Sequence, residues 1–269
     1  MKAKQKIAEL KEMKLLELSK AITKDFAYIL GAVLGDGYIY LRKYGGEIRI
    51  SVRDKDFAEN FYDSLRKWSN LSCRLYYYRG FWRVYSSSII VAKVLKNFDL
   101  NKLKDMPEEI IVAFLKGIYD AEGNLNRRRV RFYNSNITLI NLVKKLLEIV
   151  GIRPIKIYRR DKETHFIKGR KVIVKPVFTL GFDQKKNLEI FYNKIGFSIK
   201  RKQFKLEKIV TSYQRNQIMW AKEELEFLKK NSYRNYRWIA KKLNRSPRSV
   251  LDALRRYGLK LKVDNRLLS

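Results

Sequence analysis

Residues 29–37 read ILGAVLGDG and residues 115–123 read LKGIYDAEG, and the two stretches can be superimposed position by position. Small residues recur four positions apart in both stretches: Gly31 and Gly35 in the first, Gly117 and Ala121 in the second. This spacing places both small residues on one face of a helix, where the missing side chains let another helix approach closely. We therefore predict two helices that pack together through these faces.

Each of these helices ends in an acidic residue followed by glycine, Asp36-Gly37 and Glu122-Gly123. If the small faces pack together, the two carboxylates lie side by side. Carboxylates that close resist ionising together unless a cation lies between them. The pair therefore predicts a site for Mg²⁺ or Mn²⁺. The alternative is a pair of buried helices whose acidic residues only cap the helix ends.

The segments that follow each motif come in the same order, which indicates an internal duplication. The pattern after the first motif predicts strands 38–42 and 47–53, helix 56–68, strands 74–78 and 81–86, and helix 89–98. The pattern after the second predicts strand 127–133, helix 137–150, strands 155–158 and 172–182, and helix 187–195. We therefore expect an α+β fold made of two αββαββα repeats, residues 21–105 and 106–212, related by a pseudo-twofold axis.

The predicted strands alternate between apolar and polar residues, and the polar positions are largely basic. Period two places Arg49 and Arg53 opposite the aliphatic residues of strand 47–53. In strand 127–133 the residues opposite Val130 and Phe132 are Arg127, Arg129, Arg131 and Tyr133. These faces are candidate DNA-binding surfaces. The alternative is that they are ordinary solvent-facing sides of antiparallel sheets.

The charge of the chain favours a polyanionic partner. Its 269 residues include 60 Lys and Arg against 27 Asp and Glu, a formal net charge of +33. Self-repulsion of that size weakens a compact state, and nucleic acid is the first candidate to offset it. A membrane is not expected as a partner, because no stretch approaches the ~18 apolar residues of a spanning helix.

The rare residue types narrow the chemistry and the compartment. The single cysteine, Cys73, excludes a disulfide framework and a cysteine-based zinc site. The single histidine, His165, excludes nuclease chemistries that need several imidazoles, and its charged neighbours predict a solvated loop. We expect a cytoplasmic protein of a prokaryote, and the few glutamines hint at a thermophile such as an archaeon. Residues 1–20 alternate lysine and glutamate with aliphatic residues and predict a short basic helix.

With its two motifs and their flanking segments, the chain resembles the LAGLIDADG homing endonucleases in their single-chain form. The resemblance runs from about Phe26 to Val210 and includes residues 195–202, IGFSIKRK, which resemble the usual end of the second repeat. It implies two four-stranded sheets that form a saddle along the DNA major groove. It also implies a monomer that makes site-specific double-strand breaks and promotes homing of an intron or another mobile element. Asp36 and Glu122 would then be the catalytic, metal-binding carboxylates.

The resemblance also implies a lysine or glutamine near the scissile phosphates at the end of the second strand of each repeat. In the first repeat Lys55 fits that place, and we assign it a catalytic role. The matching stretch of the second repeat, residues 133–136, reads YNSN and has no lysine. This departure from the family pattern predicts that one DNA strand is cut more slowly than the other.

Residues 213–269 differ in pattern from the repeats and predict a small all-α domain with helices at 221–230, 236–243 and 247–257. Ser246-Pro247 provides an N-cap and a proline in the first turn, and Gly258 ends the last helix. The arrangement resembles a helix-turn-helix whose recognition helix offers four side chains to DNA: Arg248, Ser249, Asp252 and Arg255. A three-helix protein-interaction module is the alternative.

Two further functions fit the same features. A family of bacterial sporulation regulators resembles this layout, with a degenerate LAGLIDADG core and a C-terminal helix-turn-helix, and binds DNA without cutting it. Regulators of that kind tend to lose the motif acids, whereas Asp36 and Glu122 are both present here. Other LAGLIDADG proteins are maturases that assist the folding of intron RNA, and a basic saddle serves both purposes. The sequence therefore favours the endonuclease over the regulator and leaves the maturase open.

Overall fold

The computed structural model describes residues 22–43, 45–154, 156–160, 163–167, 170–174, 176–215 and 220–259. The basic helix predicted over residues 1–20 lies outside this part of the chain. Contacts divide the chain into two compact units, with the division between Gln214 and Arg215.

The first unit contains the two repeats. The first repeat consists of α2 (Lys24–Asp36), β1 (Gly37–Arg42), β2 (Gly45–Val52), α3 (Lys55–Ser69), β3 (Arg74–Tyr78), β4 (Phe81–Ser87), α4 (Ile89–Asn97) and the 3₁₀ helix η1 (Leu100–Asp105). The second consists of α5 (Glu108–Glu122), β5 (Gly123–Asn126), β6 (Arg129–Asn134), α6 (Ile137–Ile149), β7 (Tyr158–Arg160), β8 (Glu163–Ile167), β9 (Arg170–Val174), β10 (Val177–Phe182), α7 (Lys185–Ile190) and the π-helical turn η2 (Phe191–Ile195). Helix α8 (Lys200–Arg215) follows.

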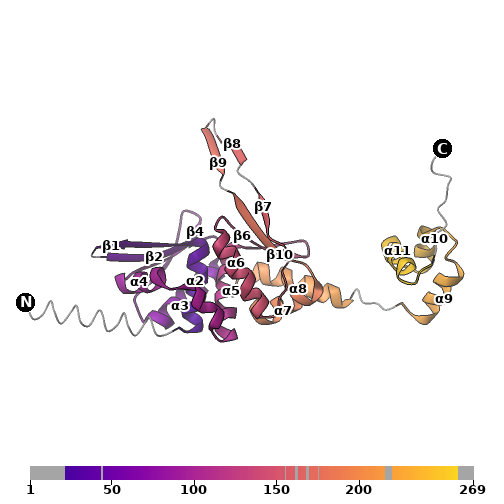
Figure 1. Ribbon diagram of the computed structural model, residues 1–269, viewed down its shortest axis with the longest axis horizontal. Helices are drawn as coiled ribbons and strands as arrows, with labels where there is room; N and C mark the ends of the chain where they lie inside the picture. The colour runs from indigo at the N-terminus through magenta and orange to yellow at the C-terminus, as the bar shows by residue number, and fades with distance from the viewer. Residues whose placement is uncertain are drawn as a thin grey trace, which may run out of the picture. The chain divides into compact units, whose positions relative to one another are not determined.

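Each repeat forms one four-stranded antiparallel sheet, with strand order β1-β2-β4-β3 in the first and β5-β6-β10-β7 in the second. The equivalent order confirms the duplicated α+β fold, and helices α2 to α5 lie on one side of the sheets (Figure 1). The inward-facing strand residues are almost completely buried and join the core: Ile48, Ile50, Val84, Val130, Phe132 and Leu180. The alternate residues therefore remain on the outer face of each sheet.

Side-chain caps fix where the helices begin. The hydroxyl of Thr23 accepts a hydrogen bond from the backbone N–H of Phe26 at 3.2 Å at the start of α2. The side chain of Asn136 accepts from the N–H groups of Thr138 and Leu139 at the start of α6. Such caps satisfy donors that have no partner within the helix, so the sequence sets these boundaries locally.

The second repeat differs from the sequence-based expectation at two places. Most of the segment expected as strand 127–133 forms β6, but Arg127 lies in the turn between β5 and β6 at φ 52° and not on the strand face with Arg129. Strand β5 was missed because Gly123 and its two asparagines have low strand propensity.

The second difference is an additional hairpin between β7 and β10. The segment expected as strand 172–182 is divided between β9 and β10, and β8 pairs with β9 in a separate two-stranded sheet. His165 was expected in a loop, but it lies on β8 opposite Val172. The charged residues of this segment hid the strand, which is defined by its backbone pairing with β9.

The second unit contains α9 (Lys222–Lys230), α10 (Tyr236–Lys242) and α11 (Pro247–Arg256). Its small core is formed by six buried residues: Leu228, Ile239, Ala240, Val250, Ala253 and Leu254. The guanidinium of Arg245 donates to Glu224 and lies 4.7 Å from the centre of the Trp220 ring. Ser246 caps α11 by accepting from the N–H of Ser249 at 3.2 Å.

No helix in the described ranges combines the length and apolar character needed to span a membrane.

Candidate metal and DNA-binding site

The two motif helices cross at backbone contact distance. A Cβ atom added to Gly31 would lie 2.3 Å from the carbonyl oxygen of Phe114, and one added to Gly117 would lie 2.1 Å from that of Tyr28. Farther along, a Cβ on Gly35 would lie 2.4 Å from the Cβ of Ala121. The small residues thus remove the side chains that would otherwise hold α2 and α5 apart, as their spacing predicts.

The close crossing brings together the carboxylates at the ends of the two helices. Asp36 is the last residue of α2 at an exposed position, and Glu122 is the last residue of α5 and half-buried. The surrounding protein displaces water from both carboxylates and thereby raises the pKa of each, and the negative charge of Asp36 raises the pKa of Glu122 further. The carboxylates are therefore close enough to repel each other.

This pair fits a divalent cation. Mutual repulsion and partial desolvation both oppose the charged form of the acids, and a cation between them would offset both effects. Magnesium sites commonly use one or two carboxylates together with phosphate oxygens of the substrate. Within the described residues, no three His, Cys, Asp or Glu side chains converge on one point that could hold a metal. The two carboxylates are oxygen donors of the kind that such sites use.

Lys202, on α8, supplies a cation at this site that was not singled out from the sequence. Its Nζ donates to the carbonyl oxygens of Asp120 and Gly123, both at 2.8 Å, at the C-terminal end of α5. Burial lowers the pKa of the Lys202 ammonium, and the charges of Asp120, Asp54 and Asp36 oppose this shift. Its charge in turn offsets part of the rise in the pKa values of Asp36 and Glu122.

A buried polar cluster fixes the start of α8 against the motif helices. Asp120 is 1% exposed, and its carboxylate accepts from the backbone N–H of Ser198 at 2.9 Å, from the Ser198 hydroxyl at 2.5 Å and from the Tyr28 hydroxyl at 2.9 Å. Burial raises the pKa of Asp120, while these hydrogen bonds lower it. The cluster positions Lys202, four residues after Ser198, beside the paired carboxylates.

Two acids at the start of α3, Asp54 at the N-cap and Asp56 in the first turn, bind the same turn of α8 from the first repeat. The guanidinium of Arg201 donates to both oxygens of Asp54 at 2.6 and 2.7 Å, and the N–H of Lys200 donates to Asp56 at 2.6 Å. The hydrogen bond from Arg201 lowers the pKa of Asp54. The sequence did not predict α8, because only scattered apolar residues such as Leu206 and Val210 mark its buried face.

Lys55, the candidate catalytic lysine from the sequence, has different contacts. It is in the first turn of α3, and its Nζ lies 2.8 Å from a carboxylate oxygen of Glu59 and 5.3 Å from the centre of the Trp82 ring. Its role at the scissile phosphate stays a prediction.

The outer face of the first sheet combines arginines with aromatic rings. The guanidinium of Arg49 lies 4.5 Å from the centre of the Tyr38 ring, and that of Arg53 lies 5.7 Å from the centre of the Phe81 ring. These cation–π contacts orient the arginines while leaving them exposed. The face therefore offers oriented donors to a ligand.

The outer face of the second sheet is more polar, and its arginines are partly engaged. Arg129 donates to Asp183 through Nε at 3.0 Å and Nη2 at 2.5 Å, and Arg131 donates to the Tyr133 hydroxyl at 3.3 Å. Arg127 is exposed in the β5–β6 turn, so it could contact a ligand from the turn and not from the strand face.

In the second unit, the four residues proposed for DNA reading lie on α11. Arg248 and Asp252 form an exposed ion pair at 3.3 Å, Arg255 is exposed in the last turn, and Ser249 is half-buried. Their positions leave Arg248, Asp252 and Arg255 accessible to a ligand.

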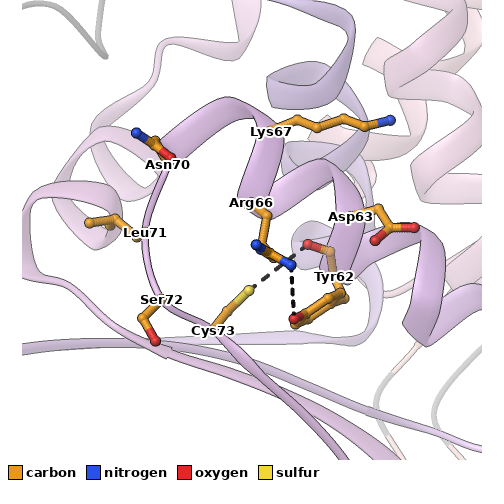
Figure 2. A pocket seen from close by; sticks show the side chains of 8 residues that line it. All are labelled: Tyr62, Asp63, Arg66, Lys67, Asn70, Leu71, Ser72 and Cys73. Atoms are coloured by element: carbon orange, nitrogen blue, oxygen red, sulfur yellow. Dashed lines mark hydrogen bonds between the residues drawn. The ribbon is translucent and has the colours of Figure 1, made fainter.

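A separate hollow of about 660 Å³ lies at the C-terminal end of α3 (Figure 2). Arg66 donates to the Tyr62 hydroxyl at 3.4 Å there, and the Cys73 thiol lies 4.0 Å from the Tyr62 carbonyl oxygen. Its lining includes neither Asp36 nor Glu122. The hollow is therefore not part of the carboxylate site.

Comparison with known proteins identifies the family. The model of the LAGLIDADG-like domain matches residues 109–196. The homing endonuclease I-DmoI from Desulfurococcus mucosus is 31% identical over 142 residues, which are 47% of this chain and 71% of that enzyme. The chain belongs to the LAGLIDADG family.

Two further comparisons extend over more of the chain. Uncharacterized protein MJ0398 from Methanocaldococcus jannaschii is 30% identical over 208 residues, 74% of this chain and 75% of that protein. The crystal structure of I-DmoI in complex with DNA and Ca shares the fold at 20% identity and a TM-score of 0.50, covering 70% of this chain and all of that one (100%). The source organisms of MJ0398 and I-DmoI are both archaea.

Proposed function

We propose that this protein is a metal-dependent, site-specific endonuclease that cuts double-stranded DNA. The observation that supports it most directly is the pairing of Asp36 and Glu122 at the ends of two tightly crossed helices, where each carboxylate has a raised pKa. A purely structural pair of helix ends has no need for two carboxylates that repel each other. The relative I-DmoI is a homing endonuclease and has been crystallised with DNA and Ca, which supports the same assignment.

Asp36 and Glu122 would hold Mg²⁺ or Mn²⁺ together with phosphate oxygens of the DNA. A bound divalent ion would supply charge stabilisation for the attacking and leaving oxygens of phosphodiester hydrolysis. The Lys202 ammonium has three N–H donors, and two of them donate to the carbonyl oxygens of Asp120 and Gly123. Its remaining N–H can face the phosphate and stabilise negative charge beside the paired carboxylates. Lys55 is a second candidate for this role on the first-repeat side.

Arginines on the outer faces of the two sheets would hold the duplex. Contacts with phosphates supply most of the affinity and make it salt-dependent, and contacts with base edges supply specificity. Arg49, Arg129 and Arg131 are the candidates on the strands, with Arg53 just after β2, Tyr133 beside Arg131 and Arg127 in the turn.

The second unit would act as a helix-turn-helix that adds a DNA contact outside the catalytic unit. Helices α10 and α11 are joined by a short turn at residues 243–246, and α11 has Arg248 and Asp252 in its first turns. Recognition helices usually contact bases through residues near their N-terminus. We further propose that the protein acts as a monomer in the cytoplasm of an archaeon and serves the mobility of an intron or similar element.

The test is cleavage of a duplex library by the full-length protein. Bound duplexes are enriched from randomised DNA, Mg²⁺ is added, and the new ends are sequenced. We expect Asp36→Asn and Glu122→Gln to retain binding and to lose cleavage at least about a thousandfold, because each removes one of the two metal-binding carboxylates. Asp63→Asn, an exposed acid on α3, is the matched control and should cut like the wild type.

The outcomes separate the endonuclease from the other functions. Cleavage by either carboxylate variant at the wild-type rate would show that the site is misassigned. Sequence-specific binding with no cleavage in Mg²⁺ or Mn²⁺ would instead support a DNA-binding regulator. Preferential binding of structured intron RNA over duplex DNA would support the maturase.

A further inference from the structure

One acidic side chain interrupts the basic outer face of the first sheet. Glu47 is the sole Asp or Glu within strands β1 to β4, whose outer positions otherwise hold arginine, serine and aromatic residues. It lies on β2, an inner strand of the sheet, paired with Tyr40 on one side and Ser87 on the other. A carboxylate in the middle of a surface that binds polyanions weakens phosphate binding, so its position calls for a specific partner.

Glu47 forms a donor–acceptor pair with Arg49, which is two residues farther along β2 on the same face. Nη1 of Arg49 lies 3.6 Å from Oε1 of Glu47, which is close enough for attraction but too long for a hydrogen bond. The guanidinium is held 4.5 Å from the centre of the Tyr38 ring. The carboxylate therefore keeps its acceptor capacity, and the arginine keeps its orientation.

The same two residues line a hollow of about 390 Å³ on this face. Arg83 and Tyr76 form part of its wall, and the Arg83 guanidinium lies 4.8 Å from the centre of the Tyr78 ring. A hollow with a carboxylate and guanidinium groups in its wall can bind the edge of a base pair that presents a hydrogen-bond donor beside acceptors.

We propose that Glu47 and Arg49 together read one C·G base pair in the major groove. Glu47 accepts a hydrogen bond from N4 of the cytosine, and Arg49 donates to O6 and N7 of the guanine. The assignment rests on the proposed function, in which duplex DNA lies along the outer faces of the sheets. It adds the identity of a base pair to that function.

The other base pairs fit this donor–acceptor pair less well. In an A·T pair, adenine takes the place of cytosine opposite Glu47. Its N7 is an acceptor beside the N6 donor and would repel the second carboxylate oxygen. Thymine offers Arg49 a single acceptor, O4, next to a methyl group, so bidentate binding is lost. A reversed G·C pair would place guanine O6 and N7 against the carboxylate. Discrimination thus comes from repulsion as well as attraction.

The experiment is selection of bound duplexes from a randomised library by the full-length protein without cleavage, in Ca²⁺, with the wild type and Glu47→Gln compared. The wild-type motif should contain a C·G position preferred about tenfold or more over the other base pairs. A glutamine at position 47 can donate as well as accept and matches adenine N6 and N7. We therefore expect the preference at that one position to move from cytosine to adenine, with the rest of the motif unchanged.

Two further variants complete the test. Arg49→Met should weaken the preference for C·G at the same position, because it removes the bidentate donor to guanine while Glu47 still accepts from cytosine. Asp63→Asn, which removes the same charge from an exposed position on α3, is the control and should select the wild-type motif. If Glu47→Gln selects the wild-type motif, the base-pair assignment is wrong while the endonuclease proposal stands. If the wild type selects no motif at all, site-specific DNA recognition itself is refuted.

Discussion

Gly117→Ala is the most direct test of the helix crossing on which the site depends. The new Cβ would lie 2.1 Å from the Tyr28 carbonyl oxygen and 3.0 Å from the Ala32 nitrogen, and both are backbone atoms. Normal contact requires about 3.2 Å, so the helices must separate by about 1 Å, since no side-chain rotation can relieve the clash.

The expected loss of stability follows from two opposing contributions. Replacing a helical glycine by alanine favours the helix by about 1 kcal/mol. Overpacking against rigid backbone costs roughly 3–4 kcal/mol, at or above the upper end of the usual range. The net destabilisation of about 2–3 kcal/mol should lower the melting temperature of the first unit by roughly 5–10 °C for a domain of this size.

Calorimetry of the full-length protein measures this change, and Gly45→Ala is the matched control. A Cβ on Gly45 would meet no atom within 4 Å, so we expect its effect to stay within about 0.5 kcal/mol. Separation of the helices should also displace Asp36 from Glu122 and slow cleavage by about a hundredfold. A Gly117→Ala protein that melts at or above the wild-type temperature would refute the close crossing.

Other expectations follow from single contacts. Tyr119→Phe should stabilise the first unit by about 1 kcal/mol or more in calorimetry, because the Tyr119 hydroxyl is buried with no hydrogen-bond partner in the described part of the chain. Arg245 lowers the pKa of Glu224, so this pair stabilises the second unit above the unfolded pKa of about 4.3 and loses that contribution as pH falls through the folded value. The melting temperature of the second unit should therefore fall more steeply with decreasing pH in the wild type than in Glu224→Gln. Parallel curves would contradict the pairing. Arg248→Ala should weaken binding of the selected duplex by about 1–3 kcal/mol if it contacts a base, with unchanged cleavage of bound DNA, and equal affinity would argue against that contact.

The sequence determined the parts of this protein that depend on local chemistry. The glycine spacing in residues 29–37 and 115–123 predicted the crossing of α2 and α5, because helical period and side-chain size are local properties. Alternation of apolar and polar residues predicted most strands of the two sheets, and Ser246 with Pro247 predicted the start of α11. Asp36 and Glu122 could be proposed as a pair because each lies at the end of such a helix.

The tertiary structure decided what depends on contacts between distant segments. Lys202 lies near Asp36 only because Asp120 and Ser198 fix the start of α8, and nothing in the periodicity of α8 indicates those contacts. The turn at Arg127 was likewise hidden, since β5 is defined by its pairing with β6 and not by its own composition. Long-range hydrogen bonds and burial set these positions, and they act between residues that the chain brings together only when it folds.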